Sequence, residues 1–170
     1  MSAPSMWVRL EQTGLGSTIA SSTWLFPTIE TLHVISIVTV IGAIAAMDLR
    51  LLGLTSGTKT IKAMERDTLP ITWIAFAFAV LTGLLLFVSK AASYMANPYF
   101  IWKTVLMGFA GVNMLVFHRY VSRDIADWNA PGSAIPLGAK LSAILSLALW
   151  LVIPFCGRVI GFTLGIYYTA

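Results

Sequence analysis

Hydrophobic and polar positions alternate along this chain in long blocks. Four apolar stretches of about 20 residues or more are separated by short polar segments. At about 1.5 Å per residue, a helix of roughly 20 residues crosses the roughly 30 Å of hydrocarbon in a bilayer. The pattern therefore predicts transmembrane helices over about 27–52, 70–92, 99–121 and 136–157.

The remaining segments are short. Residues 1–23 mix apolar and polar positions around Trp7, which predicts either a helix lying in the membrane interface or a flexible segment. Residues 24–170 form the transmembrane domain. Polar runs at 55–68 and 122–133 and the Asn97-Pro98 turn signal predict the connections. The last helix either ends at Pro154 or continues towards Tyr167.

Composition supports the same fold class. Apolar residues make up 58% of the chain, charged residues 11%, and the mean hydropathy is +0.84. We expect an all-α integral membrane protein, an up-and-down four-helix bundle surrounded by lipid. Four spans leave no room for a soluble catalytic domain. The chain also has no Ser/His/Asp arrangement and no phosphate loop, so no catalytic residues are assigned and an independent enzyme is not expected.

The positive charges indicate orientation. Seven Lys and Arg residues fall on the side of the two polar loops and four on the side of the termini, which predicts periplasmic termini in a bacterial inner membrane. The same spread of charge beside membrane segments argues against nucleic acid as a partner. The seven are Arg50, Lys59, Lys62, Arg66, Arg119, Arg123 and Lys140, and the four are Arg9, Lys90, Lys103 and Arg158.

Ionisable groups inside membrane spans are costly, so they are the first candidates for function. The polar candidates are Glu30, His33, His118 and Arg158, with Lys103 and Asn113 as secondary ones. The Glu-x-x-His spacing predicts that Glu30 orients His33, and Arg158 either completes that cluster or binds a haem propionate. A second interpretation places these three groups in water at the membrane surface. At the other side, Asp48 and Arg50 are expected to form an ion pair.

Two histidines on two helices of a bundle suggest haem b. His33 and His118 differ by about 20 Å in predicted height, so one chain cannot place both on one iron. Helical spacing instead sets His33 level with Met107 and Met47 level with His118. Each pair suits haem iron or, as an alternative, copper. Methionines at helical spacing are, however, more often packing residues than metal ligands.

Several segments carry a resemblance to known proteins. They are WLFPTIETLHV at 24–34, MDLRLLG at 47–53, TGLLLF at 82–87, YMANPYFIWK at 94–103, NMLVFH at 113–118, and Trp150 through GRVIGF. Over about residues 20–165 the chain resembles a family of small bacterial four-span membrane proteins of unassigned function. It is more distantly similar to copper-resistance-D-like and cytochrome-b-type membrane proteins, which implies haem bound through His33 or His118.

These observations favour a membrane electron-transfer subunit that binds haem b and passes electrons to quinone or to a redox partner. Two other classes stay open. One is a non-redox subunit or scaffold of a larger complex, and the other is a small transporter of metal or solute that uses the Met/His positions. We also expect a homo-oligomer or a subunit of a membrane complex, since a second copy is one source of a further axial ligand.

Overall fold

Four long helices make up the body of the protein. The computed structural model describes residues 5–55, 60–121 and 134–168, and within these ranges every regular element is helical. The long helices are α3 (Leu25–Leu51), α4 (Ile61–Ser89), α6 (Pro98–Val116) and α8 (Leu137–Thr163), and α6 continues as the π-helix η1 (Phe117–Val121).

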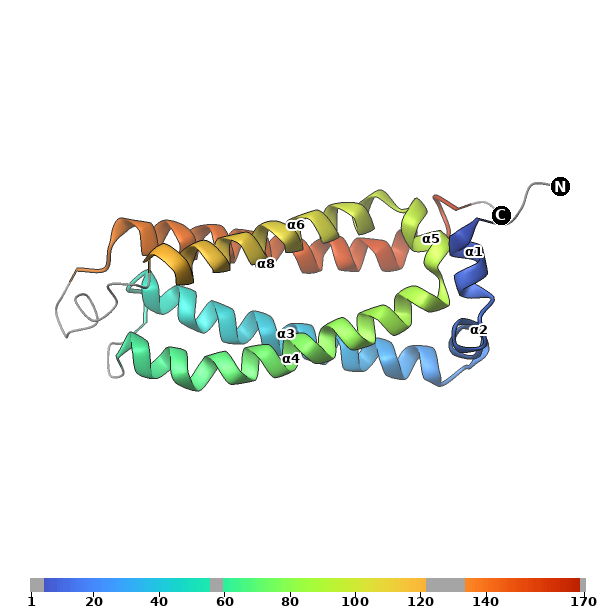
Figure 1. The fold of residues 1–170 in the computed structure, drawn as a ribbon, viewed down its shortest axis with the longest axis horizontal. Helices are drawn as coiled ribbons and strands as arrows, with labels where there is room; N and C mark the ends of the chain where they lie inside the picture. Colours follow the sequence, from blue (N-terminus) through green and yellow to red (C-terminus); the bar gives the residue numbers. More distant parts are fainter. Residues whose placement is uncertain (1–4, 56–59, 122–133, 169–170) are drawn as a thin grey trace.

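The four helices form two layers (Figure 1). One layer is α3 packed along α4, the other is α6 packed along α8, and α3 also contacts α8, whereas α4 and α6 are not a closely packed pair. The start of α3 and the end of α8 lie at one end of the bundle, which we call the terminal end. The end of α3, the start of α4, η1 and the start of α8 lie at the other, the loop end. This is the up-and-down four-helix bundle expected from the sequence.

Three short helices close the terminal end: α1 (Met6–Glu11), α2 (Gly14–Ser21) and α5 (Ala91–Ala96). The side chains of Ser5 and Thr13 cap the first two, as small hydroxyl residues commonly do. The backbone N–H of Ala92 donates to the Glu11 carboxylate at 2.9 Å, which ties α1 to α5. The segment before the first span is therefore helical from Met6, and its position in a membrane interface stays a prediction.

Two helices are longer than the apolar pattern indicated. The α4 helix begins at Ile61 rather than Pro70, because Thr60 caps it and Pro70 is accommodated inside the helix. Most of the loop predicted at 55–68 is therefore the polar first turns of α4. The α8 helix likewise continues through Pro154 and ends at Thr163, which settles where the last span ends. The polar loop predicted over 122–133, with Arg123, lies outside the described residues, as does Lys59.

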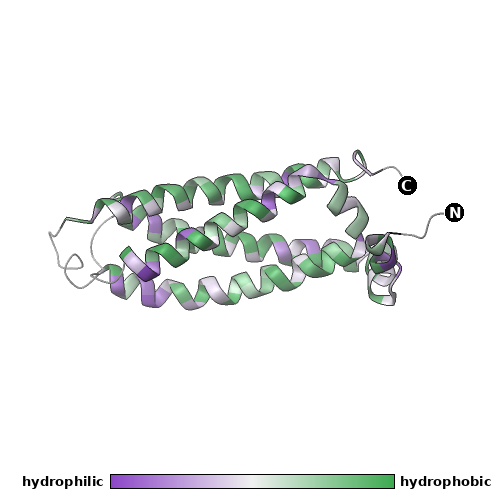
Figure 2. Ribbon diagram, turned by 45° about the horizontal axis from the view of Figure 1, so that its top comes forward, coloured by the Kyte–Doolittle hydropathy of each residue, from purple (hydrophilic) through white to green (hydrophobic). Residues whose placement is uncertain are grey.

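All four long helices are long and apolar enough to cross a membrane. Hydrophobic residues cover most of their length, and hydrophilic positions gather near the loop end and on the short helices, with a few more inside the long helices (Figure 2). Large apolar side chains such as Val38, Phe78, Phe109 and Leu151 are more than half exposed on the outside of the bundle. Such a surface suits lipid, as in an integral membrane protein.

Candidate functional sites

His33 lies on α3 near the terminal end and packs against α4. Its Nδ1 is 3.0 Å from the Thr82 hydroxyl, and a Cβ placed on Gly83 would stand 2.9 Å from its Cε1. Thr82 is 5% exposed, so the hydroxyl side of the imidazole is held inside the bundle. Only glycine at position 83 leaves room for the ring in this position.

The contacts of Thr82 favour one tautomer of His33. The Thr82 hydroxyl has one hydrogen and lies 2.6 Å from the Phe78 carbonyl, to which it donates. With that hydrogen used, the Thr82 oxygen accepts from the imidazole, so Nδ1 donates and Nε2 keeps its lone pair. Among the described residues, Nε2 has no hydrogen-bond partner.

Lys103, on α6, lies near the same imidazole from the opposite layer. The imidazole of His33 and the thiol of Cys156 both lie close enough for their ionisation to be sensitive to the charge of Lys103. Its Nζ would be 3.6 Å from a Cβ on Gly157 of α8. Lys103 thus lies beside Gly157, as His33 lies beside Gly83. We refer to His33, Lys103 and Cys156 as the terminal-end site.

Glu30 and Arg158 lie near this site but face elsewhere. Glu30 is exposed and its charge acts on Tyr94 in α5, where burial, with a smaller contribution from Glu30, raises the pKa of the phenol to about 12. The Arg158 guanidinium is also exposed and stacks 4.7 Å from the centre of the Phe162 ring. The described contacts thus do not join Glu30, His33 and Arg158 into one cluster, and the surface interpretation of Glu30 and Arg158 fits their exposure.

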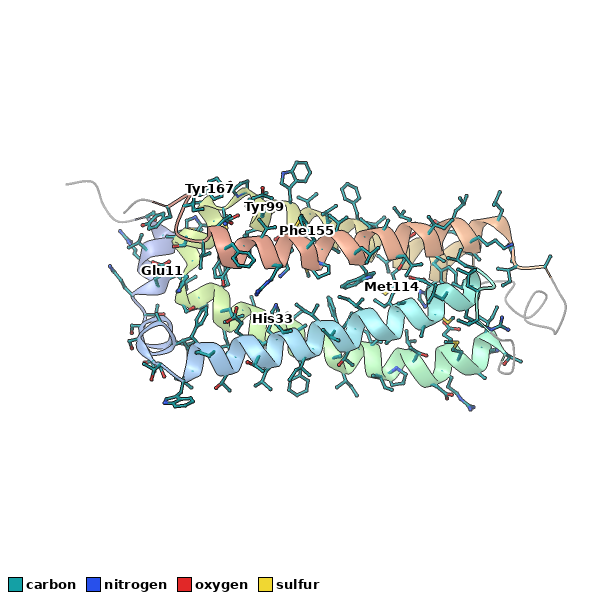
Figure 3. The ribbon with its side chains drawn as sticks, turned by 180° about the vertical axis from the view of Figure 1, so that it is seen from behind. Glu11, His33, Tyr99, Met114, Phe155 and Tyr167 are labelled. Carbon is teal, nitrogen blue, oxygen red and sulfur yellow. The ribbon has the colours of Figure 1, made fainter. Side chains whose placement is uncertain are left out.

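His118 lies in η1, close to the loop end. Its Nδ1 donates to the Met114 carbonyl at 2.9 Å, and its Nε2 is 3.4 Å from a carboxylate oxygen of Glu65 on α4. The ring is 40% exposed. Both histidines thus use Nδ1 as a donor, but Nε2 of His118 already has an acidic neighbour. Figure 3 shows His33 and Met114 at clearly different positions along the bundle axis, as expected for two separate sites.

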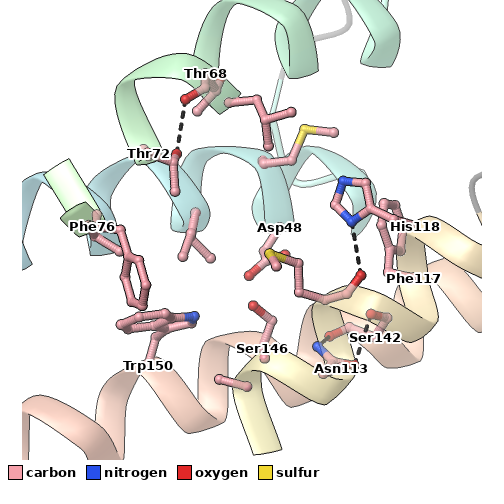
Figure 4. Close-up of a pocket in the computed structure, with 18 of the residues that line it drawn as sticks. Asp48, Thr68, Thr72, Phe76, Asn113, Phe117, His118, Ser142, Ser146 and Trp150 are labelled. Carbon is pink, nitrogen blue, oxygen red and sulfur yellow. Dashed lines mark hydrogen bonds between the residues drawn. The ribbon is translucent and has the colours of Figure 1, made fainter. Parts of the chain in front are cut away.

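A cavity of about 190 Å³ lies between the two layers in the half of the bundle nearer the loop end (Figure 4). Three methionines line it together with His118, whereas His33 is not among its lining residues. The structure therefore brings Met47 and His118 to one cavity and places Met107 there as well, away from the pairing with His33 that helical height had suggested. The methionines are Met47, Met107 and Met114.

Asp48 is the most buried ionisable group in this cavity. The residue is 6% exposed, the Ser146 hydroxyl lies beside its carboxylate, and its Oδ2 has no hydrogen-bond partner among the described residues. The ion pair between Asp48 and Arg50 that the sequence suggests stays a prediction. A buried carboxylate oxygen without a partner is costly, and it is rare away from functional positions.

Asn113 has a structural partner at the edge of the cavity. Its amide donates to the Ser142 carbonyl at 3.0 Å, and the Ser142 hydroxyl donates back to the amide oxygen at 3.0 Å. Asn97 plays a similar part at the terminal end, where its amide donates to the Thr163 hydroxyl at 2.9 Å. These bonds join α6 to α8 within the apolar interior.

Sequence reasoning did not select Asp48, Gly83 or Cys156 as site residues. The sequence suggests only that Asp48 pairs with Arg50 at the end of its helix. A single carboxylate after a long apolar run was nevertheless a signal that Asp48 lies at a buried position. Gly83 and Cys156 gave no signal without knowledge of which helices pack together.

Comparisons of the chain with protein-family models, with curated proteins and with solved structures find no match. Within the described ranges, no three His, Cys, Asp or Glu side chains gather as a metal-binding group. The sites must therefore be interpreted from their own geometry.

Proposed function

We propose that this protein is a membrane electron-transfer subunit that binds haem b through Nε2 of His33. The observation that carries the proposal is the 3.0 Å contact between Nδ1 of that histidine and the Thr82 hydroxyl, which itself donates to the Phe78 carbonyl and so favours the tautomer whose Nε2 keeps its lone pair. Histidines that ligate metals in proteins nearly always donate their other ring N–H to an acceptor in this way.

His33 is the better ligand of the two histidines. Its Nε2 has no partner among the described residues, whereas Nε2 of His118 lies 3.4 Å from Glu65 and would have to leave that carboxylate to bind iron. The His33 ring is also held on both sides, by Thr82 and by the backbone at Gly83. A rigidly held imidazole loses little freedom when it binds a metal.

Lys103 supports the same proposal. By helical rise its backbone stands roughly 7 Å from the start of α6, and that of His33 roughly 12 Å from the start of α3, so both residues lie in the half of the bundle nearer the terminal end. A haem whose propionates point towards that end would place a carboxylate near Lys103, and such a pair is a charge-assisted hydrogen bond. Haem would supply a one-electron couple; His33 would hold the iron and Lys103 would orient the macrocycle.

The proposal includes a location in a membrane and an orientation within it. The four apolar helices support insertion in a membrane, and the distribution of Lys and Arg favours a bacterial inner membrane with periplasmic termini. The terminal-end site would then face the periplasmic half of the bilayer.

The test is the haem and copper content of protein purified from cells supplied with both. We expect about one haem b per chain in the wild type, none in His33→Ala, and an unchanged amount in Ser36→Ala. Ser36 is one turn along α3, and its hydroxyl bonds only to the Leu32 carbonyl of its own helix. Copper without haem, or neither of the two in the wild type, would overturn the proposal.

A further inference from the structure

The cavity at the loop-end half differs from the terminal-end site in shape and chemistry. Its 190 Å³ is somewhat larger than the roughly 150 Å³ cavity that holds a benzene ring in another protein. Its lining includes the aromatic residues Trp73, Phe76 and Trp150 and the polar residues Asp48, Ser146 and His118, and Phe76 and Trp150 lie side by side (Figure 4). The space therefore suits one six-membered ring with polar substituents.

One residue that lines this cavity also reaches the outer surface of the bundle. Trp73, on α4, is 49% exposed. Both α4 and α6 contribute lining residues, yet these two helices are not closely packed against each other. A route between α4 and α6 would let a ligand that dissolves in the bilayer reach the cavity and leave an apolar tail among the lipids.

Asp48 supplies a polar contact that the protein itself does not use. Its Oδ2 has no hydrogen-bond partner among the described residues, although the residue is 94% buried. An ionised carboxylate accepts a hydrogen bond from a ligand hydroxyl, and a neutral carboxyl group donates one to a ligand carbonyl. The group therefore suits a ring that carries carbonyls in one state and hydroxyls in another.

We propose that this cavity binds the head group of a membrane quinone or quinol, with one ring oxygen hydrogen-bonded to Asp48. The aromatic residues stack around the ring, and the tail leaves between α4 and α6. An acyl chain of a lipid could enter the same opening, but it has no polar group for Asp48. The exchange of electrons between the quinone and the protein rests on the proposed haem function. The binding of the quinone in the cavity does not depend on that function.

A cavity-filling variant gives the sharpest test of binding. Gly111 lines the cavity, and a Cβ there meets nothing within 4 Å, so Gly111→Leu enters the cavity without disturbing the backbone. Gly108, three residues earlier on α6, also has open space around it but does not line the cavity. Gly108→Leu is therefore the matched control for helix propensity and added bulk.

The experiment titrates the protein in lipid nanodiscs with a benzoquinone that carries one isoprene unit and follows quenching of tryptophan fluorescence. We expect saturable binding by the wild type and Gly108→Leu, no saturable binding by Gly111→Leu, and about tenfold weaker binding by Asp48→Ala, which removes the hydrogen-bonding group. Equal affinity in Gly111→Leu and the wild type, or in Asp48→Ala and the wild type, would overturn the proposal.

The same samples separate this inference from the haem function. Haem content should be equal in Gly111→Leu and Gly108→Leu, because neither residue touches His33. His33→Ala should lose haem and still bind the quinone with unchanged affinity. A wild type that binds quinone but no haem would contradict only the haem function, and a wild type that binds haem but no quinone would contradict only this inference.

Discussion

The imidazole of His33 lies against the backbone of Gly83, so closely that a single added methyl group at position 83 would stand 2.9 Å from Cε1. Contacts this short between a Cβ and a ring force one of them to move. The position of the proposed haem ligand is therefore set by the absence of a side chain on the neighbouring helix.

Gly83→Ala should displace the His33 ring and reduce haem content at least tenfold. We expect the helix itself to tolerate the change, since alanine favours helix more than glycine does. Gly42→Ala is the control, because a Cβ at position 42 on α3 meets nothing within 4 Å. Haem per chain, measured from the pyridine adduct, decides the matter, and full haem content in Gly83→Ala would show that this contact does not position the ligand.

Thr82→Val should weaken haem binding by about 10- to 100-fold, the usual effect of removing the group that orients a metal-ligating histidine. Valine keeps the shape of threonine but cannot accept the hydrogen bond from Nδ1. Thr82→Ser keeps the hydroxyl and should bind haem almost as the wild type does. A haem titration of the apoprotein gives the affinities, and equal values for the valine and serine variants would argue against this role of Thr82.

Much of the fold was predictable because it depends on patterns local in sequence. The apolar blocks predicted four helices and the bundle, and the Asn97-Pro98 signal predicted the start of α6, where Asn97 accepts from the Tyr99 N–H. Pro70 misled the prediction of where α4 begins, since a proline suits a first turn but is also accommodated inside a long helix.

The sites were less predictable because they depend on which helices pack together. His33 lies inside one of the four long apolar helices, as the pattern predicts, but its neighbours Thr82, Gly83 and Lys103 come from two other helices. Helical height alone suggested Met107 as its partner, yet Met107 faces the cavity that His118 also lines. Rotation of each helix about its own axis decides such pairings, and the sequence of a nearly uniformly apolar helix does not specify that rotation well.

The reciprocal bonds between Asn113 and Ser142 should contribute measurably to the stability of the α6 and α8 layer. Asn113→Ala removes both and should lower the free energy of unfolding in detergent by about 1–2 kcal/mol. A double-mutant cycle with Ser142→Ala should give a coupling energy of about 0.6 kcal/mol, typical of hydrogen bonds between membrane helices. Purely additive effects of the two substitutions would show that the hydroxyl and the amide act independently.

Gly16 should be essential for docking α2 on the terminal end. A Cβ at this position would lie 2.6 Å from the Glu11 carbonyl oxygen and 2.9 Å from that of Val88, and backbone atoms cannot move aside cheaply. Gly16→Ala should therefore destabilise the protein by about 1–3 kcal/mol, visible as a lower Tm.

Gly14→Ala, in the same helix, is the matched control, since nothing lies within 4 Å of a Cβ there. It should leave the Tm unchanged or raise it slightly. A Gly16→Ala variant as stable as Gly14→Ala would mean that α2 docks differently from the packing described above.

The most direct test of the account is the dithionite-reduced minus oxidised visible spectrum of the purified protein, recorded for the wild type, His33→Ala and His118→Ala. The account predicts a haem b band in the wild type that is lost in His33→Ala and retained in His118→Ala, because only His33 presents Nε2 without a partner among the described residues. A band that survives in His33→Ala, or a wild-type spectrum without one, would contradict it.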